Sequence, residues 1–150
     1  CGGLGLELAL TADFRLAGEN ATLGVPEIIL GLIPDCGGTT RLTRMLGPVW
    51  AKEMIMTGDM LPAKRAYEIG LVNQIFPEAT LEEKTIAFLD KLLQRPSLAL
   101  GLAKRAIDWG VGLDKMAHME IEAYVQSLLI TAKDFPETLQ KGLATLLKKK

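Results

Sequence analysis

Three carboxylic acids near the start of the chain stand among apolar residues and glycines, where charged side chains are not expected. Glu7 lies in CGGLGLELAL, Glu27 in VPEIILG and Asp35 in IPDCGG. A carboxyl group in apolar surroundings tends to keep its proton to higher pH, which suits it to proton transfer near neutrality. The three acids are therefore candidates for general acid–base chemistry.

Two of these acids also have a purely structural interpretation. Glu7 could be an acid in the first turn of a helix, where the helix dipole stabilises negative charge. Asp35 could cap a helix that follows the glycine pair at 37–38, although Thr39 or Thr40 could cap the same helix. Both interpretations stay open at the level of the sequence.

The elements that must position the acids are mixed α/β at first and helical later. Strands are predicted at 14–18, 21–25 and 71–76, where short apolar runs are bounded by turn residues. Helical spacing of apolar residues predicts helices over 6–12, 39–46, 49–58, 62–70, 80–94, 96–110, 113–131 and 136–150. Within 96–110 the spacing predicts that Leu100, Ala103 and Ile107 are buried.

Composition excludes several classes of partner. The chain has 17 basic and 18 acidic residues, a net charge of -1 and 5% aromatic residues, so nothing predicts a nucleic-acid or anionic membrane surface. No apolar run is long enough to span a bilayer. Lys148–Lys150 read as a solvated helix end, in preference to a phosphate site.

Few residues are available for nucleophilic or metal chemistry. The cysteines are Cys1 and Cys36, which gives neither a disulfide framework nor zinc-ligand spacing and favours a reducing compartment. His118 is the single histidine, and its helical context favours an ordinary packing role. No metal site is expected.

The chain begins without Met, inside an apolar stretch that lacks the charged region of a secretory signal. We therefore expect a protein that is not secreted, and a chain that is part of a longer protein.

Three segments of the sequence carry a resemblance to a known family. GGLGLELAL, VPEIILGLIPDCGGTTRLTRMLG and AKEMIMTGDMLPAKRAYEIGLVNQIFP resemble the enoyl-CoA hydratase/isomerase (crotonase) superfamily, and the likeness extends over essentially the whole chain. It implies an α/β fold, a partial crotonase-like ββα spiral followed by a helical C-terminal trimerisation region. Residues 1–78 would form the later part of the core, and residues 79–150 the helical region.

The resemblance also implies a site. Glu7 matches the first catalytic glutamate of the family and Glu27 the second. Leu4, flanked by Gly3 and Gly5, stands where a backbone N–H donates to the thioester oxygen, and the family usually has glycine in the place of Leu4. The other oxyanion donor and most contacts to coenzyme A would lie upstream, so we expect residues 1–150 alone to be inactive.

The implied activity is reversible hydration of 2-enoyl-CoA thioesters through an oxyanion-stabilised enolate. One alternative is an enoyl-CoA or dienoyl-CoA isomerase that uses Asp35 and Glu27, since such isomerases carry an aspartate where Asp35 stands. Another is an inactive structural subunit. The resemblance implies an acyl-CoA substrate, no further cofactor, a homotrimer or hexamer, and a bacterial cytoplasmic or mitochondrial matrix location.

Overall fold

The computed structural model describes residues 1–147 and divides into two compact units. The first comprises Cys1–Ala87, and the second begins at Phe88, inside helix α4 (Leu81–Leu93). The basic end predicted at Lys148–Lys150 lies outside the described residues. Each unit is best understood by itself.

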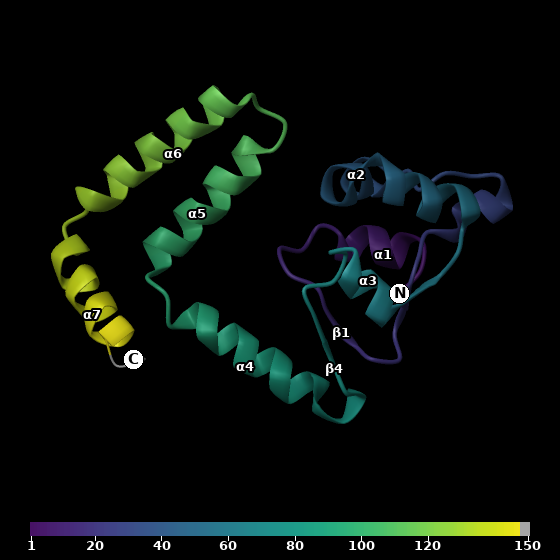
Figure 1. Cartoon of the computed structure of the whole chain (residues 1–150), viewed down its shortest axis with the longest axis horizontal. Coiled ribbons are helices and arrows are strands. Elements are labelled where there is room, and N and C mark those ends of the chain that lie inside the picture. The colour runs from purple at the N-terminus through teal and green to yellow at the C-terminus, as the bar shows by residue number, and fades with distance from the viewer. Residues whose placement is uncertain (148–150) are drawn as a thin grey trace. The chain divides into compact units, whose positions relative to one another are not determined.

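The first unit alternates short strands with helices. Strand β1 (Leu16–Gly18) pairs in parallel with β4 (Gln74–Phe76), and β2 (Thr22–Leu23) pairs antiparallel with β3 (Leu61–Pro62). Figure 1 shows β1 and β4 side by side although their paired positions are 58 residues apart in sequence (74 minus 16). The remaining elements of this unit are α1 (Leu4–Ala9), η1 (Pro26–Leu30), α2 (Gly38–Thr57), α3 (Ala63–Glu68) and η2 (Glu78–Thr80). The predicted strands are confirmed in place and are shorter than predicted.

One apolar core holds the first unit together. Leu6 of α1 and Leu10, the residue that caps its C-terminal end, lie four residues apart and are both buried, as helical spacing predicts. They belong to the same buried cluster as Leu42 and Met54 of α2. Burial of this apolar surface supplies the main stabilisation of the unit.

Helix α2 contains a sharp kink. Gly47 has φ 80° and ψ 167°, and Pro48 follows it, so the two helices predicted on either side are confirmed as separate segments of α2. The expectation that Thr39 or Thr40 caps the helix is wrong. Gly37, at φ 95°, is the N-cap, and the Thr39 hydroxyl instead donates to the Pro34 carbonyl at 2.9 Å.

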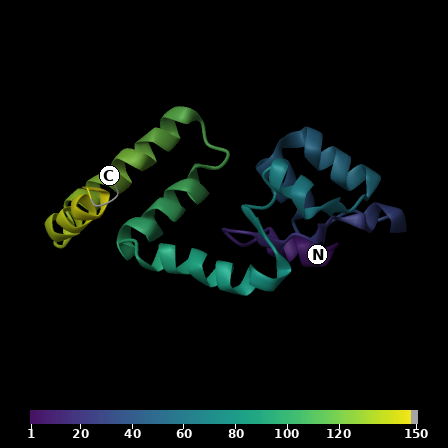
Figure 2. The ribbon, with the colours of Figure 1, turned by 60° about the horizontal axis from the view of Figure 1, so that its bottom comes forward.

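The second unit is helical throughout its described part. After α4 come α5 (Ser97–Gly110), α6 (Lys115–Ile130) and α7 (Phe135–Leu147). Helices α5 and α6 lie side by side and run in opposite directions, as both ribbon views show (Figure 1, Figure 2). Asp114 begins α6, because its carboxylate accepts the Met116 and Ala117 N–H groups at 3.0 and 3.1 Å. Among the described residues, no helix is both long and apolar enough to cross a membrane.

The buried face of α5 differs from the predicted one. Leu100, Ala103 and Ile107 are exposed, whereas Ala106 and Gly110 are buried. Gly110 lies close to His118 of α6, while several larger apolar side chains of α5 remain exposed. The periodicity therefore identified an apolar face that this chain itself does not bury.

Candidate active site

Glycines shape the turn into α1. Gly3 has φ 55° and ψ -131°, which a residue with a side chain rarely adopts. Its N–H donates to the Gly24 carbonyl at 2.9 Å, beside an isolated parallel bridge between Gly2 and Gly24. An extended segment thus passes directly into the helix at Leu4.

Leu4 supplies the free backbone donor of this turn. The N–H groups of Gly3 and Gly5 are taken by Gly24 and Gly2, the latter at 3.1 Å. The Leu4 N–H has no hydrogen-bond partner among residues 1–147, as expected for the first residue of a helix. Of the three positions predicted for the oxyanion site, Leu4 carries the available donor, and the two glycines shape the backbone around it.

Glu7 is buried and held by the start of α2. Its side chain is 3% exposed, and its Oε1 accepts the Gly38 N–H at 2.8 Å. Gly38 opens α2, so its N–H is one of the unsatisfied donors at a helix N-terminus, where negative charge is stabilised. A side chain at Gly38 would place its Cβ 2.7 Å from Glu7 Oε1, so glycine is needed there. The carboxylate is thereby fixed in position despite its burial.

Glu27 lies against the backbone of Gly3. Its Oε1 is only 2.9 Å from the point that a Cβ on Gly3 would occupy. Its Oε2 is buried and accepts no hydrogen bond from the described residues. Buried carboxylate oxygens are usually hydrogen-bonded, so an unpartnered one beside the helix start marks a position suited to a bound water or substrate.

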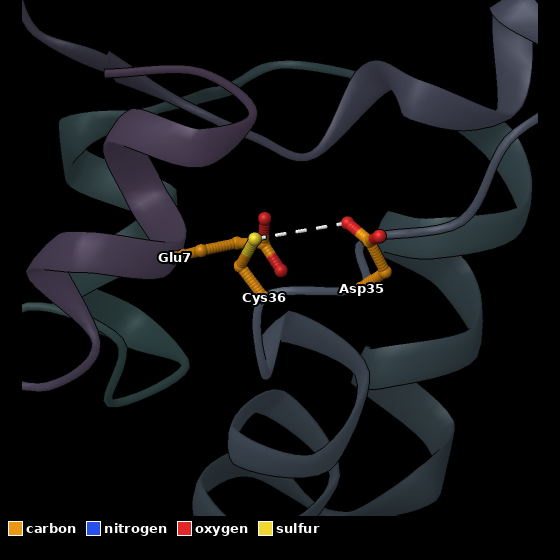
Figure 3. Close-up of side chains that lie close together, drawn as sticks. All are labelled: Glu7, Asp35 and Cys36. Carbon is orange, nitrogen blue, oxygen red and sulfur yellow. Dashed lines mark hydrogen bonds between the residues drawn. The ribbon is translucent and has the colours of Figure 1, made fainter.

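Asp35 and Cys36 come from the loop before α2 and lie next to Glu7. The three side chains point toward one another in Figure 3, and one carboxylate oxygen of each acid and the Cys36 Sγ all lie within 4.8 Å of one another. The Cys36 thiol donates to Asp35 Oδ1 at 3.7 Å. In the described part of the chain, Asp35 accepts no helix N-terminal N–H, so the helix-cap interpretation of Asp35 is wrong.

The charge of this cluster acts on the thiol. The pKa of Cys36 is raised above its ordinary value, first by the neighbouring Asp35 carboxylate, then by partial desolvation and by Glu7, with Glu27 contributing least. The Cys36 side chain is therefore a protonated thiol, and a hydrogen-bond donor, at neutral pH. All three predicted acids contribute to its electrostatic environment.

The cluster of Glu7, Asp35 and Cys36 is a poor metal site. A metal needs its cysteine ligand deprotonated, which the raised pKa of Cys36 opposes. One oxygen of Glu7 is already engaged by Gly38. We assign no metal to these residues on the basis of their chemistry.

Two parts of this arrangement are not evident from the sequence. The number and spacing of the cysteines bear only on disulfide and zinc-ligand roles for Cys36, whereas its position next to Asp35 is the sequence signal for a thiol–carboxylate contact. The support of Glu7 by Gly38 spans 31 residues and depends on tertiary structure. His118 takes no part, since it lies in α6 against Gly110, where a side chain on residue 110 would collide with its ring.

A separate cavity of about 700 Å³ lies within the second unit. It is lined by Arg95 and Ser97 at the start of α5 and by Lys141, Thr145 and Leu146 of α7. It contains none of the predicted acids. The predicted acids all lie in the first unit.

Comparisons with known proteins show which proteins the chain is similar to. The family model described as enoyl-CoA hydratase/isomerase matches residues 1–149. A crotonyl-CoA hydratase of Syntrophomonas wolfei is 41% identical over 150 residues, which is 99% of this chain and 55% of that protein. An enoyl-CoA isomerase/hydratase of Mycosarcoma maydis is 38% identical over 138 residues, which is 91% of this chain and 50% of that protein.

A solved structure gives the same result for the fold. The crystal structure of an enoyl-CoA hydratase from Bacillus anthracis matches with a TM-score of 0.92 and 40% identity, over 97% of this chain and 56% of that one. The chain belongs to the enoyl-CoA hydratase/isomerase family. Its α/β class with a helical C-terminal region is that of a partial crotonase fold. The chain spans about half the length of these relatives.

Proposed function

We propose that the complete protein hydrates 2-enoyl-CoA thioesters, with Glu7 and Glu27 as the acid–base pair. The observation that carries this proposal is the arrangement of two carboxylates about one free donor. Glu7 is buried in the first turn of α1, Glu27 lies against Gly3, which precedes α1, and the N–H of Leu4, the first residue of α1, has no partner among residues 1–147. Addition of water to an enoyl thioester needs an acid–base pair and donors to the thioester oxygen, and these residues supply the pair and one of the donors.

The proposed reaction uses each group in turn. The Leu4 N–H donates to the thioester oxygen and stabilises the negative charge that develops when the C=C bond is attacked. One such donor contributes on the order of 10²–10³ in rate. The two glutamates hold the water. One of them takes a proton from the water as the water oxygen bonds to the β-carbon. A carboxyl proton is delivered to the α-carbon, which completes addition of H and OH across the double bond.

The surroundings of each glutamate support its proposed part in holding the water and moving protons. No group in residues 1–147 donates a hydrogen bond to Glu27 Oε2, which leaves this oxygen available to accept one from the water. Glu7 Oε1 is fixed by Gly38, so its orientation is set before substrate binds. Preorganised groups of this kind need little rearrangement during reaction.

The test is Glu7→Gln and Glu27→Gln in the complete protein, with crotonyl-CoA as substrate. Loss of either acid–base group should lower kcat by about 10²–10⁴ while the CoA ester still binds. Glu120→Gln removes the same charge from α6 and should leave turnover unchanged. Near-normal turnover in Glu7→Gln or Glu27→Gln would contradict the proposal. Absence of turnover in the unmodified protein would favour an inactive structural subunit.

Asp35 favours a second candidate, double-bond isomerisation of an enoyl- or dienoyl-CoA. Its carboxylate lies within 4.8 Å of the Glu7 carboxylate and does not cap α2. A third acid at the site offers a second place from which to remove or deliver a proton. Asp35→Asn should therefore lower isomerisation far more than hydration when both are assayed on the same preparation. Equal losses would indicate a structural role, and an unchanged isomerase rate would remove Asp35 from the site.

We also propose a homotrimer or a hexamer of two trimers, located in a bacterial cytoplasm or mitochondrial matrix. The uncovered apolar side chains of α5, among them Leu100 and Ile107, support self-association. An acyl-CoA thioester is the only small molecule that the proposed reaction needs besides water.

A further inference from the structure

We propose that Cys36 is a positioning residue, whose thiol holds the Asp35 carboxylate beside Glu7 and so supports the isomerase chemistry of the site. This inference rests on the proposed function, because it assigns Cys36 to the isomerisation that Asp35 would perform. Cys36 itself has no direct part in proton transfer. It acts through Asp35.

The geometry identifies a specific contact. The Cys36 thiol donates to Asp35 Oδ1 at 3.7 Å, and it supplies the only hydrogen bond to the Asp35 side chain from within residues 1–147. Asp35 is exposed and sits in a loop, so without that bond its side chain would be free to rotate into solvent. Figure 3 shows the thiol and both carboxylates turned toward one another.

The backbone of Cys36 is itself held. Arg41 of α2 donates from Nη1 to the Cys36 carbonyl at 2.9 Å, within the same turn that leads into the helix. A residue with a fixed backbone and a short side chain has few orientations available. The thiol is thus a well-placed donor, even though S–H is a weak one.

The charges around the thiol keep it in the donating form. Asp35, Glu7 and Glu27 are acidic, and each raises the pKa of Cys36, while Arg41 is the basic group of α2 that contacts this loop. A thiolate at this position would add a further negative charge to the carboxylates. A protonated thiol instead shares its hydrogen with one of them, which partly offsets the repulsion between Asp35 and Glu7.

The contact can be tested without any enzyme activity. In a Cys1→Ala background, the rate at which iodoacetamide alkylates Cys36 reports its thiolate fraction. Asp35→Asn should lower the thiol pKa and speed alkylation severalfold at mildly alkaline pH. Asp90→Asn, which removes the same charge from α4, should leave the rate unchanged. Equal rates in the Asp35→Asn and Asp35 proteins would overturn the proposed contact.

The functional step is tested by two substitutions in the complete protein. Cys36→Ala removes the donor and should lower isomerisation of a dienoyl-CoA severalfold relative to hydration of crotonyl-CoA. Cys36→Ser keeps a donor of similar size and should restore the ratio of the two rates. If Cys36→Ala leaves this ratio unchanged in an active protein, the positioning role is wrong. If the unmodified protein does not isomerise at all while the alkylation result holds, it is the isomerase proposal that fails.

Discussion

The two units of the molecule bury their apolar residues very differently. The first unit packs its core from both helices and strands, with Leu6, Leu42 and Leu71 fully buried. In the described part of the second unit the buried hydrophobic residues are Ala106 and Val125. Many of its larger apolar side chains are exposed, as the 63% exposure of Ile107 and the 80% exposure of Leu93 illustrate.

This difference separates two roles. A unit with its own core can hold side chains at fixed distances, and the candidate active site lies in that unit. A group of helices with uncovered apolar faces gains its stability from contacts beyond its own residues. From this comparison we expect chemistry in the first unit and self-association through the second.

The largest expected effects follow from substituting one leucine in each unit of the complete protein. Leu6→Ala removes a fully buried side chain and should cost about 2–5 kcal/mol, independent of protein concentration. Leu100→Ala removes a side chain that is 40% exposed in this chain, so it should act mainly through self-association. Its unfolding midpoint should depend on protein concentration more steeply than that of the unsubstituted protein.

Thermal unfolding at several concentrations, with sedimentation to measure the oligomeric state, distinguishes the two effects. If Leu100→Ala lowered stability by the same amount at every concentration, Leu100 would act within one chain, as Leu6 does, and not through self-association. The contrast between the two units would also be broken if the substitution left association unchanged.

Much of the site was predictable because its acids are close to glycines in sequence. Glu7, Glu27 and Asp35 stood out as charges in apolar segments, and the glycines around Leu4 indicated a sharp turn. The Gly38–Glu7 hydrogen bond could not be predicted, since the tertiary fold alone brings these residues together. Their roles in catalysis remain predictions.

The fold was predictable to a similar degree, with errors that have physical causes. Strand positions follow from short apolar runs, so those at 16–18 and 74–76 were found. The buried face of α5 was assigned wrongly because periodicity identifies an apolar face but does not say what covers it. The cap of α2 was assigned wrongly because Gly37 adopts a left-handed conformation that a threonine would disfavour.

A smaller pair of opposite effects comes from two helical glycines. A Cβ on Gly38 would lie 2.7 Å from both Glu7 Oε1 and Pro34 Cβ, whereas one on Gly101 of α5 meets nothing within 4 Å. Gly38→Ala should therefore destabilise by about 1–3 kcal/mol through overpacking and displace Glu7, lowering turnover as well. Gly101→Ala should stabilise by about 0.5–1 kcal/mol, because alanine loses less backbone entropy in a helix.

Denaturant unfolding and a hydration assay on the same preparations measure both consequences. Stabilisation by Gly38→Ala, or normal turnover in that variant, would show that the close approach of α2 to Glu7 does not constrain the site. A loss of stability in Gly101→Ala would indicate that α5 is covered at this position in the complete protein.

The smallest expected effect concerns a surface ion pair of the second unit. Lys141 Nζ lies 2.6 Å from Glu137 Oε1 on α7, and both side chains are mostly exposed. The pKa of Glu137 is lowered by this hydrogen bond and by the charge of Lys141. The ion pair therefore stabilises the folded state above the pKa that Glu137 has in the unfolded chain, and this stabilisation is lost as the pH falls through the pKa of Glu137 in the folded protein. The pKa of Lys141 is raised by the same contact, so its contribution is lost as pH rises through the folded value.

Glu137→Gln should therefore lower the unfolding midpoint slightly at neutral pH and low salt, by less than any substitution above. The difference should vanish in about 1 M salt, where the screening length is near 3 Å, and also in strong acid, where the carboxylate is protonated in both states. Glu120→Gln on α6 is the matched loss of one carboxylate, and differential scanning calorimetry across pH and salt compares the two. A decrease in Glu137→Gln that persists in high salt would mean that this side chain stabilises α7 by packing rather than by charge. The exposed surface of the second unit would then contribute more to stability than its few buried residues suggest.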